Sequence, residues 1–209
     1  DSWFERLQNL FPPDLDGEVR LFSNLDTAVG ACTAARGDII IVFPGYTMTV
    51  TAAASLALDV AGITVLGLGY KGARPIIDFT TATAASVRVS AANVTLDNFE
   101  ITAGFDALVG MIDVNSDYFT MRNCRILFTS GTTIQATKVV LCDSTNVVGS
   151  LLVENCDFIG DTTVGTVSAV EVNGGSYHTI RNCTFWGNFD TTSGGAIINN
   201  GDAATQIDI

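Results

Sequence analysis

The sequence predicts an all-β fold, a right-handed parallel β-helix that is capped at its N-terminus by an α-helix. The first observation is a repeated segment whose last copy is His-Thr-Ile-Arg-Asn-Cys-Thr-Phe at 178–185. Earlier copies lie at 94–101, 119–126 and 151–158, and a degenerate copy with Gly instead of Asn lies at 63–68. The Gly/Asn positions 67, 98, 123, 155 and 182 are separated by 31, 25, 32 and 27 residues, the spacing of a repeat fold with variable loops.

The second observation is another repeated strand between these copies. Its segments are 56–59, 87–90, 112–115, 140–143, 170–173 and 197–200. Each reads apolar, variable, apolar and then small polar, which is the period of a strand with one buried face. Strands this short cannot bury a face alone, so they must stack on the next copy, about 4.8 Å away, to make a continuous core.

The Asn positions are expected at the bend between two strands. There an L-residue often enters the left-handed region, which Asn and Gly tolerate best. We also expect the stacked Asn side chains to hydrogen-bond along their column, because buried amides need partners.

Outward charges should alternate in sign from coil to coil. The first column consists of the residues directly before each Asn, which are Asp97, Arg122, Glu154 and Arg181. The second column consists of the residues two places after each Asn, which are Glu100, Arg125, Asp157 and Thr184. Each exposed pair stabilises by only about 0.2 to 1 kcal/mol. Their main effect is on register, since a slip of one residue would bury them.

The repeated pattern Val/Ile-x-Ile-x-Asn-Cys/Phe-x-Phe/Ile resembles the pectate-lyase-like β-helix superfamily over about residues 23–209. That superfamily includes pectinolytic and other polysaccharide-cleaving enzymes and phage tailspikes. The resemblance implies a scaffold that works outside the cell or on a virion surface. It says little about chemistry, because the repeated residues specify the scaffold.

Residues 1–22 are expected to form a separate amphipathic helix and linker before the β-helix of residues 23–209. Pro12-Pro13 should end the helix. Its apolar stripe needs a partner, which is either the flank of the β-helix or another subunit or particle. The stripe consists of Trp3, Phe4, Leu7, Leu10 and Phe11. At the other end the next coil should be under way at Ile209, so we expect the solenoid to continue or to be capped by assembly.

A short capping helix is expected next. Ser23 is its predicted N-cap, with Asp26 three residues on, and Arg36-Gly37 closes it. The apolar run 38–43 should be a strand buried on both faces, followed by a turn at Pro44-Gly45 and a strand over 46–51.

The remaining coils should share inward columns and one variable corner. The predicted inward columns are Ile101, Ile126, Phe158 and Phe185, and Val65, Leu96, Met121, Val153 and Ile180. The loops 79–86, 102–110, 128–138, 159–168 and 187–195 all precede the second type of strand. Insertions gathered at one corner of a repeat fold often build its functional face.

Charge and cysteine content exclude several classes of function. The chain has 22 acidic and 10 basic residues, a net charge of -12, which argues against nucleic acid or an anionic membrane as a partner. No apolar run has the length of a membrane span.

The five cysteines, Cys32, Cys124, Cys142, Cys156 and Cys183, lack metal-ligand spacing. We expect free core thiols, because parallel Cβ vectors disfavour the alternative of a disulfide between neighbouring coils.

Candidate catalytic residues lie on the outward column of the second strand type. Asp113 and Glu171 are two coils apart, about 9.6 Å at the backbone. An inverting glycoside hydrolase needs about 6.5 to 9.5 Å between two carboxyl groups. Arg88 beside Asp113 is the alternative, a lyase-like base with an orienting carboxylate. The competing interpretation is a surface salt bridge and a lone Glu171, with Leu141 and Ile198 interrupting the face.

Other candidates for ligand binding are aromatic or acidic residues. Trp186, Tyr118 and Phe189 are candidates for stacking on sugar rings. No cofactor is expected; calcium would require the loop residues Asp106, Asp161 and Asp190 to converge, and turn formation is their alternative role. His178 is in phase with apolar strand positions, which favours a core-edge histidine over a catalyst.

Two functions follow from these features. The first is a structural or adhesive protein that binds glycans, such as a virion appendage or surface fibre, and that forms a homo-oligomer, with a trimer as one form. The alternative is a polysaccharide lyase or glycoside hydrolase that uses Asp113, Glu171 and Arg88.

Overall fold

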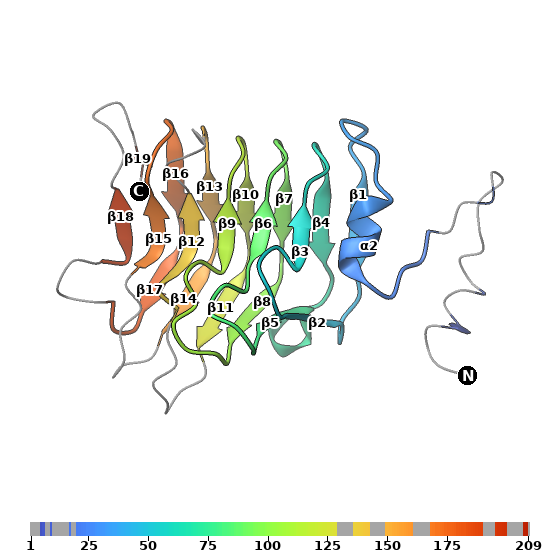
Figure 1. The fold of residues 1–209 in the computed structure, drawn as a ribbon, viewed down its shortest axis with the longest axis horizontal. Helices are drawn as coiled ribbons and strands as arrows, with labels where there is room; N and C mark the ends of the chain where they lie inside the picture. The colour runs from blue at the N-terminus through green and yellow to red at the C-terminus, as the bar shows by residue number, and fades with distance from the viewer. Residues whose placement is uncertain are drawn as a thin grey trace.

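The computed structural model shows an all-β parallel solenoid with three parallel sheets and a short helix near its N-terminus (Figure 1). It describes residues 20–128, 136–142, 149–160, 168–189, 195–199 and 207–208, with the single residues 5, 6, 9 and 17. The predicted apolar stripe of the N-terminal helix lies outside the described residues.

Successive coils add one strand to each sheet in turn, so the described residues form one seven-stranded sheet and two six-stranded sheets with pairing from coil to coil. Sheet A contains β1 (Ile39–Val42), β4 (Thr64–Gly67), β7 (Thr95–Asp97), β10 (Thr120–Arg122), β13 (Leu152–Glu154), β16 (His178–Arg181) and β19 (Ile207–Asp208). Sheet B contains β2 (Thr47–Val50), β5 (Ile76–Phe79), β8 (Glu100–Ala103), β11 (Arg125–Phe128), β14 (Asp157–Ile159) and β17 (Thr184–Trp186). Sheet C contains β3 (Leu56–Leu58), β6 (Val87–Val89), β9 (Ile112–Val114), β12 (Lys138–Cys142), β15 (Ser168–Val172) and β18 (Ile197–Asn199). A 3-10 turn, η1 (Lys71–Ala73), precedes β5.

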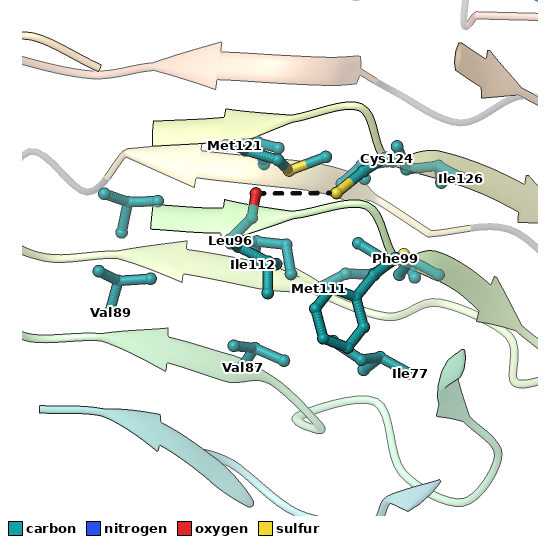
Figure 2. Close-up of a cluster of buried hydrophobic side chains, with 14 of the residues drawn as sticks. Ile77, Val87, Val89, Leu96, Phe99, Met111, Ile112, Met121, Cys124 and Ile126 are labelled. Atoms are coloured by element: carbon teal, nitrogen blue, oxygen red, sulfur yellow. Dashed lines mark hydrogen bonds between the residues drawn. The ribbon is translucent and has the colours of Figure 1, made fainter. Parts of the chain in front are cut away.

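The predicted inward columns are confirmed by the register. In sheet A, Met121 pairs with Leu96 and with Val153, and all three side chains are fully buried. In sheet B the column ends in Phe158 and Phe185, whose rings stack with centroids 5.0 Å apart. Figure 2 shows the core between the sheets, filled by interdigitated apolar side chains from several coils. The coils therefore share one continuous apolar core, to which α2 adds Leu25 and Val29.

The Asn column forms the corner between sheets A and B, as predicted. Asn98, Asn123, Asn155 and Asn182 have φ between 53° and 63°, in the left-handed region. The backbone N–H of Asn123 donates to the carbonyl of Glu154, 3.1 Å away on the next coil, and the N–H of Asn155 does the same to Arg181. The corner thus extends the hydrogen bonding of the sheets between coils.

The Asn side chains use other partners than the predicted amide column. Asn98 donates to the carbonyl oxygen of Gly67 at 2.7 Å, and Asn123 donates to Asp97 at 2.7 Å. Gly67 departs from the column too, since it lacks a positive φ. A Cβ there would lie 2.4 Å from the carbonyl oxygen of Asn98, so close backbone approach requires the glycine.

A second left-handed column lies at the corner between sheets C and A, where the sequence pattern had indicated none. Its members have φ between 56° and 77°, and they are Ala35, Gly62, Asn93, Tyr118, Ser150 and Tyr177. Tyr118 N–H donates to the Gly149 carbonyl at 2.9 Å, and the same bond joins other neighbouring coils. Left-handed residues therefore occur at two of the three corners of the solenoid, although Gly67 is an exception in the column between sheets A and B.

The predicted alternation of charge is present in the register. Arg122 lies between Asp97 and Glu154, and its Nε donates to Asp97 at 2.8 Å. Arg181 binds Glu154 through two nitrogens, at 2.9 and 2.7 Å. In the second column Arg125 pairs with Glu100 at 3.3 Å.

The helix α2 (Leu25–Gly30) lies against β3 and β1 at the N-terminal end (Figure 1), which is consistent with a cap. Its N-cap is Asn24, whose Oδ1 accepts from Thr27 N–H at 3.0 Å, so the prediction of Ser23 was wrong. Asp26 instead accepts the N–H of Ala57 at 2.9 Å and thereby ties the helix to β3. The helix ends at Gly30, before the predicted Arg36-Gly37.

Strand β1 differs from the prediction of a strand buried on both faces. Ile39 and Ile41 are 62% and 52% exposed, whereas Val42 is buried. Among the described strands, β1 pairs only with β4, and its outward side chains are not covered. The continuous apolar run therefore includes an exposed apolar stripe, not a second core face.

Replacing Asn155 tests the left-handed corner. Asn155→Ala should lower the free energy of unfolding by about 1 kcal/mol, because a Cβ without a compensating polar group is disfavoured in the left-handed region. Asn155→Gly is the control and should stay within about 0.5 kcal/mol of the parent, since Gly adopts this region freely. Chemical denaturation followed by circular dichroism measures both; equal effects of the two variants would contradict the role of the corner.

Candidate functional site

The predicted catalytic residues lie on one outward column of sheet C. The register places Arg88 beside Asp113, Asp113 beside Leu141, and Leu141 beside Glu171. Arg88 is exposed and Asp113 is half-buried. Asp113 and Glu171 are therefore two coils apart, about 9.6 Å at the backbone, with a leucine between them.

Glu171 is not the lone carboxylate of the competing interpretation. Its Oε1 lies 2.8 Å from Nζ of Lys138, and the two side chains are 6% and 23% exposed. Lys138 begins β12, one coil earlier, and its side chain spans the difference in position along the strands. Removing one partner of an ion pair that is buried this deeply would leave the other charge without a counter-ion, which destabilises the fold.

Ser168 is the first residue of β15 and lies beside Lys138 in sheet C. Ser168 is the register partner of Lys138 and is fully buried. Its Oγ has no hydrogen-bond partner, the one such buried side-chain atom among the described residues. Burying a hydroxyl without a partner costs free energy.

The column has limited capacity for acid–base chemistry. A hydrolase of the inverting type needs two carboxyl groups that both face a substrate. Asp113 is partly accessible, but Glu171 is buried and neutralised by Lys138. Of the predicted set, the structure brings Arg88 and Asp113 together and leaves Glu171 in a separate pair.

The three aromatic candidates do not share a surface. Tyr118 lies at the corner between sheets C and A, whereas Trp186 ends β17 in sheet B; each is 56% exposed. Phe189 packs on Phe185 with ring centroids 6.3 Å apart, so it belongs to the edge of the core. Tyr177, which is 72% exposed, occupies the same corner column as Tyr118. Tyr177 was not among the sequence-based candidates, because it lies between the repeated segments 170–173 and 178–185 and belongs to neither pattern.

His178 is a structural residue, as predicted. It is fully buried, its Nδ1 accepts the N–H of Leu151 at 3.2 Å, and its Nε2 lies 3.0 Å from the carbonyl oxygen of Gly174. These partners require a neutral imidazole that carries its proton on Nε2. Burial lowers the pKa of His178, and the hydrogen bond to Gly174 opposes this only in part.

All five cysteines are free thiols, as expected. The sulfur of Cys124 lies 3.9 Å from the carbonyl oxygen of Leu96 on the preceding coil (Figure 2), and Cys156 and Cys183 repeat this contact. Hydrogen bonds to Cys124 and Cys183, together with burial, raise the pKa of Cys156. The hydrogen bond from Cys156 in turn lowers the pKa of Cys183 to about 7. Burial raises the pKa of Cys142 to about 12.

Metal binding has no support in the part of the chain that the structure describes. No group of three or more His, Cys, Asp or Glu side chains is placed there to hold a metal ion. The carboxylate of Asp106 accepts the N–H of Ala107 at 2.9 Å, a turn-forming bond. Asp161 and Asp190, the other two calcium candidates, lie outside the described residues.

No protein-family model matches the chain, and neither does any curated protein or solved structure. Within the described residues, no helix is long and apolar enough to cross a membrane.

The ion pair of Glu171 and Lys138 can be tested by measuring the free energy of unfolding of variants. Glu171→Gln should lower the free energy of unfolding by about 2 kcal/mol, because it leaves the Lys138 charge largely buried without a counter-ion. The double variant Lys138→Met/Glu171→Leu should recover most of this loss, since neither charge remains. Glu154→Gln, in an exposed pair, is the control and should cost less than about 1 kcal/mol. A double variant that is less stable than Glu171→Gln would contradict this assignment.

His178 should make stability depend on pH. Its folded pKa lies below the ordinary value of 6.5, so the unfolded chain binds the proton more tightly. The stability contribution is complete above the unfolded pKa and is lost as the pH falls through the folded pKa. His178→Asn keeps an acceptor at the δ position and cannot be protonated near neutral pH. We expect this variant to lose less free energy of unfolding than the parent between about pH 7 and pH 5. Identical pH profiles would contradict the neutral, buried histidine.

Proposed function

We propose that this chain is a structural or adhesive β-helix protein, a component of a virion appendage or surface fibre that acts outside the cell. The observation that carries the proposal is the outward face of sheet C. Its two candidate carboxylates are separated by Leu141, and Glu171 is committed to Lys138. The described residues thus supply a rigid stacked scaffold without a convergent catalytic cluster. The resemblance to the pectate-lyase-like scaffold, which includes tailspikes, supports the same role.

The N-terminal end has features suited to attachment. Exposed Ile39 and Ile41 lie on β1, beside a mainly apolar cavity of about 460 Å³ between α2 and β1. Arg20, which belongs to the predicted linker within residues 1–22, lines this cavity. Apolar surface of this kind is often an assembly site. We therefore propose that the N-terminal end, with the stripe of Trp3, Phe4 and Leu7, joins the protein to other copies in a homo-oligomer such as a trimer, or to a particle.

The alternative function is cleavage of a polysaccharide. The specific observation in its favour is that Arg88, Asp113 and Glu171 lie on one straight outward column. Two coils separate the carboxylates by about 9.6 Å at the backbone, within side-chain reach of the separation in inverting hydrolases. In a lyase, Arg88 would act as the base and the neighbouring Asp113 carboxylate would orient it. For the hydrolase, Glu171 would have to exchange Lys138 for the substrate.

Native mass and product analysis decide between the two functions. The purified full chain should form a stable multimer and release neither reducing ends nor unsaturated products from neutral and acidic polysaccharides. Asp113→Asn is the matched variant, because Asp113 is partly exposed and its replacement keeps the shape of the side chain. A monomer, or cleavage that Asp113→Asn abolishes, would overturn the structural proposal.

A further inference from the structure

Two tyrosines share the corner column between sheets C and A. Tyr118 has φ 59° and Tyr177 has φ 61°, both in the left-handed region. For a bulky side chain this conformation is an outlier, and the other corner of the solenoid uses Asn instead. The corner hydrogen bonds hold the backbone in place, as Tyr118 N–H to the Gly149 carbonyl and Ser150 N–H to the Ser176 carbonyl show. Tyrosine is therefore not the residue that the backbone favours here.

The rings contribute little to the core. Tyr118 and Tyr177 are 56% and 72% exposed, whereas the residue after each of them, Phe119 or His178, is fully buried. Local strain combined with exposure of a large ring is an observation that points to a contact outside the chain. Tyr70 is equally exposed, at 73%, but its backbone is extended, so it shows no such conflict.

The register makes the two rings equivalent. Thr120 pairs with Leu152, and Leu152 pairs with Thr179, so the corner positions 118, 150 and 177 are aligned on successive coils. Tyr118 and Tyr177 are thus two coils apart, about 9.6 Å at the backbone, and the smaller Ser150 lies between them. A straight ligand along the solenoid axis can contact both rings.

The surroundings of the rings are polar. Ser150 lies between them, Asn93 occupies the same column one coil earlier, and Asp117 directly precedes Tyr118. Isolated rings among hydroxyl, amide and carboxylate groups do not make the contiguous apolar patch that self-association favours. They match a ligand with apolar faces and many hydroxyl groups. The net charge of -12 and the neighbouring Asp117 disfavour an anionic ligand.

We propose that Tyr118 and Tyr177 form a two-ring platform that binds a neutral polysaccharide lying along the solenoid axis. Sugar rings stack on the two tyrosines, and the polar groups between them bind sugar hydroxyls. This inference rests on the proposed adhesive function and names its ligand class and contact surface. Trp186 lies in a different sheet and does not belong to the platform.

The test is calorimetric titration of the full chain with dextran, mannan and xyloglucan, and with polygalacturonate as the acidic comparison. Tyr118→Asn and Tyr177→Asn should each weaken binding of the neutral polymer about tenfold, because each removes one stacking surface. Both variants should melt at the same temperature as the parent or higher, since Asn accepts the left-handed conformation. Tyr70→Asn is the matched control and should leave binding unchanged.

Four outcomes would overturn the platform. They are no binding of any neutral polymer by the parent, binding of polygalacturonate alone, unchanged binding in both corner variants, and a fall in native mass in those variants without loss of glycan binding. The last would make the corner a contact between copies. Failure of the proposed function is distinguishable, because it appears as depolymerisation or as a monomer in the parent protein whatever the tyrosine variants do.

Discussion

The parallel hydrogen bonding from coil to coil is the interaction on which the rest of this structure depends. Strands of two to five residues cannot bury an apolar face alone, so each coil is stable only in register with its neighbours. The two left-handed corners extend that register beyond the strands, because their N–H groups also donate to the next coil. The free energy cost of the strained residues is thus offset by backbone bonds that would otherwise be lost at each turn.

Side-chain columns follow from this register. Identical positions on successive coils face the same way, so the core, the alternating charges and the stacked thiols all repeat at one spacing. The same geometry limits chemistry on the outward faces, because groups on one column are held at multiples of the interstrand distance. Outward side chains therefore meet either as register partners one coil apart, as Arg88 and Asp113 do, or by reaching across coils, as Lys138 does.

Much of the scaffold was predictable from the sequence, because the relevant signals are periodic and local. The Asn corner, the inward columns and the charge register all rest on residues that recur at one position in each repeat. The second corner was not predictable, since Gly62, Asn93, Tyr118 and Ser150 share a backbone conformation but no chemistry. The N-cap is Asn24 and not Ser23 because the backbone becomes helical only at Leu25, and the sequence pattern does not specify that residue.

The candidate site was less predictable than the fold. The predicted alignment of Arg88, Asp113 and Glu171 on one column is present in the register, but the pairing of Glu171 with Lys138 was missed, because it joins positions that are not register partners. The exposure of Ile39 and Ile41 was missed as well, since a continuous apolar run does not reveal whether both faces of a strand are covered. Such contacts depend on side-chain reach and on chain ends, which a repeat pattern does not encode.

Residue-resolved amide hydrogen exchange tests most directly whether the corners carry the register. The amides of Asn98, Asn123 and Asn155 lie in turns, and Asn155 is solvent-exposed, yet each donates to a carbonyl of the next coil. If the corners hold the coils together, these amides will be protected as strongly as those of the neighbouring strands. Exchange as fast as that of exposed turns would show that the strands alone maintain the solenoid.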